Sequence, residues 1–267
     1  MFLRTALILL VGSHLAAGSL EPKFTKDSLG VSLYKNGKPY FAFSSESSDS
    51  GEHSRYVLPS EDYRHFLTVD LTQAPGPGHR PKADLCLLDT DGNTLFSKSG
   101  YDAAPSLFFM ATDEEGRPYS RFLAEDASSI ICFASAQGDS GTAGTETPKL
   151  VVLGRDGKEL FKREGEAAGV RTDDKVYLSR NGRYLGYWRA EGGETQLFAV
   201  NLRSGKSVLL PASTKVTEGH TVEELDEISD DGQWVGSFPL DGQDGKVFKD
   251  SSDQVITRKI TLKLFSR

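Results

Sequence analysis

Short apolar runs separated by glycine-containing polar turns recur along most of this chain. In three places an apolar run leads into an Asp-Gly or Ser-Gly turn and then into a second apolar run. Glycine in such a turn accepts positive φ at little cost, which the tight turns of β-hairpins require. The three hairpins predicted in this way are 85–96, 150–161 and 197–210.

A second, longer motif marks the turn that precedes these hairpins. Residues 179–188 align with residues 229–238, and both follow the pattern Ser-x-Asn/Asp-Gly-x-aromatic-aliphatic-Gly-x-aromatic. Weaker copies of the motif occupy residues 60–66 and 124–130. The aromatic and β-branched residues after each turn suit a pleated, half-buried surface. Each copy therefore predicts a tight turn that leads into a strand.

One repeat unit contains two hairpins, or four antiparallel strands, which is the content of a propeller blade. Residues 31–43 form a hairpin without its partner, and 229–238 with 255–265 form another incomplete unit. Completing one blade from both termini would remove the sheet edges that favour aggregation. We expect an all-β, β-propeller-like fold of four or five blades of antiparallel four-stranded sheets closed by the termini. An irregular β-sandwich with similar hairpins is the alternative.

Two segments depart from this repeat. Residues 73–81 contain several prolines and glycines, so they predict a loop that cannot join a strand ladder. Residues 106–122 place two apolar runs around a polar turn and predict an extra hairpin. Helix is scarce: residues 221–224 have the form of a capping box, with room for one or two turns before residue 229.

The Ser-x-Asp-Gly-x-x-aliphatic turn, followed by a strand that ends in Asp-x-x-Gly-Lys/Asn, resembles the blade repeat of TolB-type periplasmic β-propellers. The same repeat is similar to that in the propeller halves of prolyl-oligopeptidase-like enzymes. The resemblance covers about residues 56–265 and is strong only in the last two copies. It implies a propeller and, by analogy, a protein partner.

The first 18 residues have the three parts of a secretory signal peptide. Arg4 supplies the positive start, residues 6–11 the apolar stretch, and Ala16-Ala17-Gly18 a cleavage site of small residues. We expect a single mature domain, residues 19–267, that is periplasmic or secreted, without an integral membrane segment after cleavage. Because Arg4 lies in the signal peptide, the mature chain keeps 30 of the 31 Lys and Arg residues and all 38 Asp and Glu residues. This charge of −8 makes nucleic acid an improbable partner.

The two cysteines, Cys86 and Cys132, could form a disulfide, because an exported protein meets an oxidising compartment. Both lie in apolar runs, where buried free thiols are also common. The sequence leaves the two states open. Neither cysteine has CxxC spacing, which argues against a redox or zinc role.

Catalytic motifs find little support in the sequence. Residues 138–141, Gly-Asp-Ser-Gly, copy the segment around the nucleophile of trypsin-like proteases, but no matching histidine segment is present. The chain also lacks a Gly-x-Ser-x-Gly elbow. The aromatic residues of the repeat predict packing between blades rather than a sugar-binding surface. These residues are Tyr184, Tyr187, Trp188, Trp234 and Phe238.

Candidate metal ligands are scattered. Residues 89–93 begin like a calcium loop but lack its later carboxylates, so we interpret them as a hairpin turn. Six acidic residues between 226 and 244 would attract calcium only weakly, and a solvated loop explains them better. We expect no cofactor, with calcium the one weak candidate. The mature histidines are isolated in sequence: His53, His65, His79 and His220.

These observations predict a non-catalytic platform that binds a protein or another envelope or extracellular partner. Loops between the strands of a propeller carry its binding residues. A carbohydrate-active hydrolase or lyase, with carboxylates gathered in the central channel, is the alternative. The predicted binding-loop residues are His79, Arg80, Tyr101, Arg117 and Tyr119.

Overall fold

The computed structural model describes residues 19–24, 31–42, 54–72, 82–102, 110–112, 117–134, 149–163, 176–191, 194–240, 247–252 and 254–265. The predicted signal peptide and residues 73–81 and 138–141 lie outside this part of the chain. In the described part, strands dominate, and the one helical segment is the 3-10 turn η3 (Val222–Glu224). The expected all-β class with antiparallel sheets is confirmed.

The strands form a series of antiparallel sheets in which neighbours follow the order of the chain. We name five of them A to E. Sheet A contains β1 (Leu20–Phe24), β2 (Val31–Lys35) and β3 (Lys38–Phe41). Sheet B contains β4 (Ser54–Pro59), β5 (His65–Thr72), β6 (Lys82–Asp89) and β7 (Thr94–Asp102). Sheet C contains β10 (Ser129–Ala134), β11 (Lys149–Gly154) and β12 (Glu159–Lys162).

Sheet D contains β13 (Val176–Leu178), β14 (Tyr184–Glu191), β15 (Glu194–Asn201) and β16 (Ser207–Pro211). Sheet E contains β19 (Glu227–Ile228), β20 (Gln233–Pro239) and β21 (Thr257–Lys263). Sheets B and C join at one residue pair, Asp102 of β7 with Phe133 of β10, so their strands form one seven-stranded sheet in the order β12-β11-β10-β7-β6-β5-β4 rather than two separate blades. Two small hairpins complete the fold: β8 (Met110–Thr112) with β9 (Pro118–Ser120), which confirms the extra hairpin, and β17 (Lys215–Thr217) with β18 (His220–Thr221).

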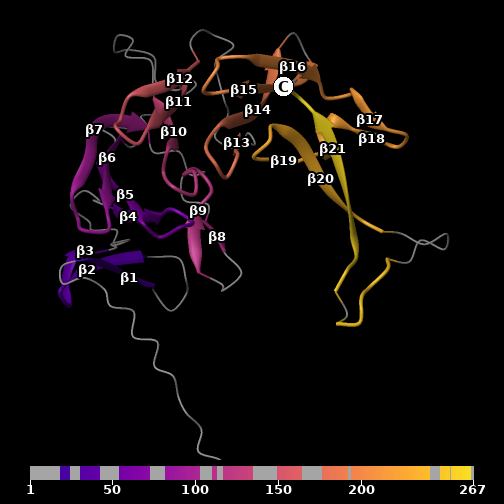
Figure 1. Ribbon diagram of the computed structural model, residues 1–267. Coiled ribbons are helices and arrows are strands. Elements are labelled where there is room, and N and C mark those ends of the chain that lie inside the picture. The colour runs from indigo at the N-terminus through magenta and orange to yellow at the C-terminus, as the bar shows by residue number, and fades with distance from the viewer. Residues whose placement is uncertain are drawn as a thin grey trace, which may run out of the picture.

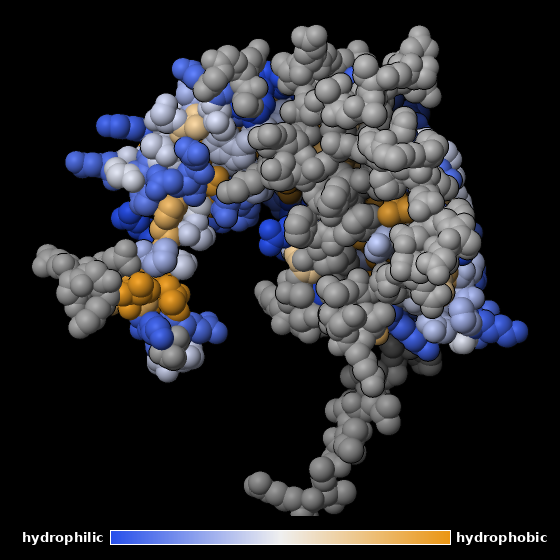
Figure 2. Space-filling view, turned by 180° about the vertical axis from the view of Figure 1, so that it is seen from behind, coloured by the Kyte–Doolittle hydropathy of each residue, from blue (hydrophilic) through white to orange (hydrophobic). Residues whose placement is uncertain are grey.

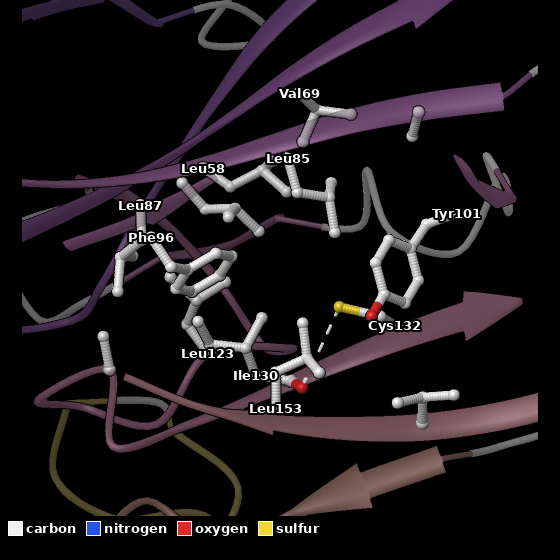
Figure 3. Close-up of a cluster of buried hydrophobic side chains, with 14 residues drawn as sticks. Leu58, Val69, Leu85, Leu87, Phe96, Tyr101, Leu123, Ile130, Cys132 and Leu153 are labelled. Atoms are coloured by element: carbon white, nitrogen blue, oxygen red, sulfur yellow. Dashed lines mark hydrogen bonds between the residues drawn. The ribbon is translucent and has the colours of Figure 1, made fainter. Parts of the chain in front are cut away.

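The five sheets stack face to face along an arc (Figure 1). The alternation of side chains along β6 shows how a sheet packs against a neighbour on each face. Leu85 and Leu87 enter the core between sheets B and C, whereas Leu88 enters the core between sheets A and B. Likewise, Ile130 faces sheet B, and Ile131 packs in the core between sheets C and D. Figure 3 shows the B–C core, with apolar side chains from both sheets. Each inner sheet is thus covered on both faces.

The core between sheets D and E is built around aromatic rings. Trp234 has an exposed fraction of 0%, and Trp188 is buried beside it. Tyr187, the neighbour of Trp188 in the chain, packs instead in the core between sheets C and D. Tyr177 meets Trp234 edge to face at 5.0 Å between ring centroids. The indole Nε1 of Trp234 donates a hydrogen bond to the carbonyl of Val222 at 3.1 Å. The predicted packing of these aromatic residues between sheets is confirmed.

The predicted glycine hairpin turns are also confirmed. Gly92, Gly157 and Gly205 have φ of 80°, 74° and 71° in the turns that enter β7, β12 and β16. The carboxylate of Asp89 accepts hydrogen bonds from the backbone N–H groups of Asp91 and Asn93. Residues 89–93 therefore form the hairpin turn that we expected in place of a calcium loop.

The expected closure by the termini is not found in the described residues. Strand β1 pairs with β2, β21 pairs with β20, and sheets A and E share no strand pair in these ranges. Four strands occur in sheets B and D, while sheets A and E have three each. The prediction missed β1 because it contains Pro22, which a strand tolerates at its sheet's edge.

Candidate functional site

The four copies of the longer motif form turns with one common geometry. We call them the inner turns: turn 1 (residues 60–65), turn 2 (124–129), turn 3 (179–184) and turn 4 (229–233). In turn 3 the hydroxyl of Ser179 donates to Asn181 and accepts from the N–H of Tyr184 at 3.0 Å. Ser60 and Ser229 make the equivalent contacts in turns 1 and 4. The fourth residue of every inner turn has positive φ: Tyr63, Ala127, Gly182 and Gly232.

The inner turns touch one another along the concave side of the arc. The N–H of Asp62 donates to the carbonyl of Glu125 at 3.3 Å, and the N–H of Glu125 donates to the carbonyl of Arg180 at 2.7 Å. The N–H of Asn181 donates to Oδ1 of Asp230 at 2.7 Å. These bonds link sheets B, C, D and E in turn. They bring the second residue of each turn into one line.

These second residues are all charged, and we call them the inner charge cluster: Glu61, Glu125, Arg180 and Asp230. Nε of Arg180 lies 2.9 Å from Oε2 of Glu61 and 3.2 Å from Oε2 of Glu125. Arg180 in sheet D thus reaches past sheet C to sheet B. Its side chain is 57% exposed and that of Glu61 is 19% exposed.

A second set of charges lies beside turns 1 and 2. Arg155 pairs with Asp126 at 3.1 Å, and Nδ1 of His65 lies 3.7 Å from Asp62. Burial lowers the pKa of His65, and the charge of Arg155 lowers it further against the opposing effect of Asp62. Burial tends to raise the pKa of Asp126, but hydrogen bonds from Ser128 and the charge of Arg155 outweigh burial and lower it. The carboxylate of Asp126 is therefore ionised at neutral pH.

This arrangement is unlike the acid–base pair of a glycoside hydrolase, which needs one carboxylic acid with a raised pKa. Each carboxylate of the inner charge cluster contacts a guanidinium or a backbone N–H. Asp231 in turn 4 has a lowered pKa because Ser229 and Gln233 donate hydrogen bonds to it. The described carboxyl groups with a shifted pKa all shift downward: Asp89, Asp126, Asp156, Glu224, Asp231 and Asp250.

No group of three His, Cys, Asp or Glu side chains in the described ranges is arranged to hold a metal ion. His65 lies in β5 near the carboxylates of Asp62 and Asp126, and His220 lies in β18 with its Nδ1 3.5 Å from Glu224. His53 and His79, with the acidic residues 241 and 244, fall outside the described ranges. Calcium binding therefore stays a prediction from sequence.

The predicted binding-loop residues do not gather in one place. Tyr101 is buried in the B–C core, where burial raises the pKa of its hydroxyl to about 12. The guanidinium of Arg117 lies over the ring of Tyr63 in turn 1, at 4.6 Å from the centroid. Tyr119 lies in β9, and His79 with Arg80 falls outside the described residues. Arg117 is therefore placed beside turn 1.

The two cysteines are free thiols. Cys132 is buried in the B–C core (Figure 3), whereas Cys86 packs against the core between sheets A and B. Sheet B lies between these two cores, so the thiols point to opposite faces of it. Of the two states that the sequence left open, the structure has the unpaired one. Burial raises the pKa of the Cys132 thiol.

An exposed apolar cluster was missed by the sequence analysis. It lies on an extension between β20 and β21 that we call the arm, and it is visible as an orange patch in Figure 2. The backbone of the arm is tied together, because Leu240, Phe248 and Ile256 exchange three hydrogen bonds of 2.8–2.9 Å. The apolar cluster consists of residues that are 40–49% exposed: Leu240, Val247, Phe248, Val255 and Ile256. The pairs Val247-Phe248 and Val255-Ile256, outside the repeat, were its signal in the sequence.

No family model and no curated protein matches this chain. Among solved structures, a prolyl endopeptidase is 15% identical over 83% of this chain and 29% of its own, with a TM-score of 0.38. A structure assigned as a TolB from Agrobacterium tumefaciens is 14% identical over 74% of this chain and 62% of its own, with a TM-score of 0.33. A luciferin-regenerating enzyme is 11% identical over 92% and 76%, with a TM-score of 0.31. The chain thus spans less than two thirds of the first two structures.

Proposed function

We propose that this chain is an exported, non-catalytic, propeller-type platform that binds a protein partner. The observation that carries the proposal is the pairing within the inner charge cluster. Arg180 neutralises Glu61 and Glu125 at 2.9 and 3.2 Å, and Asp230 accepts a hydrogen bond from a backbone N–H. A carboxylate whose oxygens are engaged by a guanidinium or a backbone N–H of the protein is poorly placed to give a proton to a substrate.

The surface supplies a second line of support. Five apolar side chains gather on the arm, and exposed apolar groups of this kind favour contact with proteins. The remaining large apolar side chains that are exposed in the described ranges occur singly, each on a different strand, as is usual for a protein surface. Export and a periplasmic location rest on the sequence of residues 1–18. In the described ranges, no helix has the length and apolarity to cross a membrane.

The test compares partner binding with turnover. The mature chain, its Phe248→Ser variant and its Leu209→Ser variant are each used to capture proteins from envelope extract under cross-linking. Leu209 is 42% exposed on β16, away from the arm, so it is a matched control for the loss of an exposed apolar side chain. We expect one protein to be enriched by the wild type and by Leu209→Ser and to be lost with Phe248→Ser.

The enzyme alternative gives the opposite result. Turnover of polysaccharide substrates by the wild-type chain, abolished in Glu61→Gln, would overturn the proposal and establish catalysis at the inner turns. The Glu61→Gln variant keeps the size of the side chain and removes its charge. Its folding is checked by urea unfolding, so that lost activity is not confused with lost structure.

A further inference from the structure

The last sheet of the arc has an open outer edge. In sheets B and D a fourth strand follows the third after a glycine turn, at Gly92 and Gly205. In sheet E the corresponding third strand is β21, and within the described residues it is the edge of the sheet, in the order β19-β20-β21. Among the described strands, none takes beside β21 the position that β7 and β16 fill in their own sheets.

The alternation of an antiparallel ladder fixes which backbone groups of β21 face this edge. The carbonyls of Gln233 and Val235 accept hydrogen bonds from residues on the β19 side, Ser229 and Asp226. The alternate residues of β20 therefore bond to β21, and their partners there are Leu262, Ile260 and Arg258. These alternate residues are Trp234, Gly236 and Phe238. The remaining residues of β21 direct their N–H and C=O groups to the open edge: Thr257, Lys259, Thr261 and Lys263.

The side chains along β21 define what could pair there. Ile260 and Leu262 belong to the D–E core, so an added strand would meet apolar neighbours on that face. On the other face stand Lys259 and Lys263, and both are exposed. They lie on a chain whose net charge is −7. A complementary strand would therefore alternate apolar with acidic side chains.

The arm continues from the same edge. Ile256 directly precedes β21, and its carbonyl accepts a hydrogen bond from Leu240 at 2.8 Å. A segment that paired with β21 and extended past Thr257 would run toward Ile256 and Val255 of the apolar cluster, which directly precede β21 in the chain. The edge and the cluster thus adjoin each other along the chain.

We infer that the outer edge of β21 takes up an extended segment of a protein partner, with alternating acidic and apolar side chains, as the fourth strand of sheet E. Strand addition of this kind obtains affinity from main-chain hydrogen bonds and specificity from alternate side chains. The inference rests on the proposed function, because it supplies the site for the protein partner. A second copy of this chain is a poor occupant, because pairing β21 with itself would place Lys259 and Lys263 near other cations.

The test uses two synthetic peptides as probes, one alternating glutamate with valine over the length of β21 and one alternating lysine with valine. Binding to the mature chain is measured by fluorescence anisotropy. We expect the glutamate peptide to bind and the lysine peptide to bind at least about tenfold more weakly. Equal binding of the two peptides, or no binding of the glutamate peptide, would overturn the inference.

A backbone variant separates strand addition from simple charge attraction. Thr261→Pro removes an N–H that faces the open edge and is not used by β20, so sheet E can still form. Its matched control, Thr261→Val, keeps the N–H group. We expect Thr261→Pro to weaken binding of the glutamate peptide at least about tenfold and Thr261→Val to leave it unchanged. Full binding by Thr261→Pro would refute strand addition.

If Thr261→Pro fails to fold by circular dichroism, a double variant takes its place. Lys259→Glu with Lys263→Glu keeps every backbone group and reverses the charge of the edge. We expect it to prefer the lysine peptide, and an unchanged preference would overturn the inference. A natural partner captured equally by the wild type and by Thr261→Pro would leave the platform function standing and remove the edge as its site.

Discussion

Two of the four inner turns have glycine at the position of positive φ, and two do not. Gly182 and Gly232 occupy this position in turns 3 and 4, whereas Tyr63 and Ala127 occupy it in turns 1 and 2 with φ of 54° and 55°. Positive φ costs a residue with a side chain about 1–2 kcal/mol relative to glycine. The same backbone shape nevertheless occurs in all four turns. The stacking of the sheets therefore imposes the turn geometry, and local preference only assists it.

The two classes of turn also differ in their surroundings. A Cβ atom on Gly182 would lie 2.6 Å from Oγ of Ser128 and 2.8 Å from Cβ of Ala124 in the neighbouring turn. Turn 2 packs so closely on turn 3 that no side chain fits there. Ala127, in contrast, is fully buried with its methyl group accommodated. Glycine is thus required in turn 3 for space as well as for φ.

The largest expected effect follows from this crowding. Gly182→Ala should destabilise the protein by about 3 kcal/mol, because about 1–2 kcal/mol of backbone strain adds to overpacking of similar size. Gly205→Ala is the matched control, since Gly205 has a similar φ of 71° and no atom within 4 Å of its Cβ position. It should cost only the strain. Urea unfolding measures both, and equal losses would show that the inner turns are not closely packed.

The next effect comes from the serine of the turn. Ser179→Ala should destabilise the protein by about 2 kcal/mol, because the buried hydroxyl donates to Asn181 and accepts from the N–H of Tyr184. Turn 2 has Ala124 at this position and makes its turn without the hydroxyl. Ser207→Ala, on the exposed start of β16, is the control and should change stability little. A loss equal to that of the control would mean that the hydroxyl bonds contribute nothing.

Turn 1 differs from turn 3 in its response to pH. Both turns end at the first residue of the following strand, and this residue is His65 in turn 1 and Tyr184 in turn 3. The pKa of His65 lies below its ordinary value of 6.5 in the folded protein. The unfolded chain therefore takes up a proton as pH falls below about 6.5 while the folded protein does not, and stability decreases in that range. The groups that face His65 are Asp62, Asp126 and Arg155.

The measurement is urea unfolding of the wild type and of His65→Gln from pH 8 to pH 5, a range set by the ordinary histidine pKa of about 6.5. We expect the decrease below about pH 6.5 to be smaller in His65→Gln. A wild type and a variant with parallel pH profiles would show that His65 titrates alike in the folded and unfolded states.

The smallest effect tests whether turn 2 is strained. Ala127→Gly relieves about 1 kcal/mol of backbone strain and loses about 0.8 kcal/mol from burial of a methyl group. The two changes nearly cancel, so the free energy of unfolding should stay within about 0.5 kcal/mol of the wild type. The contrast with Gly182→Ala in the same assay makes the comparison of the two turns quantitative. A loss as large as that of Gly182→Ala would contradict it.

Much of this fold could be predicted from local sequence. Asp-Gly and Asn-Gly turns mark the hairpins because glycine lowers the cost of positive φ, and the aromatic residues after turns 3 and 4 are buried as expected. The degenerate turns 1 and 2 were recognised through their repeat position alone. The pairing of β1 with β2 depends on tertiary packing, so no local sequence pattern predicts it.

The candidate site was less accessible to sequence reasoning. Glu61 and Arg180 are separated by two sheet interfaces along the chain, so their ion pair exists only because the inner turns converge. The residue at the second position of the motif differs from one turn to the next, so the repeat gave no sign that these positions form the inner charge cluster. The arm was missed because its apolar pairs resemble ordinary strand residues, and only their exposure distinguishes them.

The central claim is an arc of stacked sheets in which no described strand pairs with the outer edge of β21. Hydrogen exchange at single amides of β21 tests this claim most directly. The amides of Arg258, Ile260 and Leu262 bond to β20 and should be protected. Those of Thr257, Lys259, Thr261 and Lys263 face the open edge and should exchange rapidly. Uniform protection along β21 in the isolated chain would mean that another strand already occupies the edge and would contradict this account.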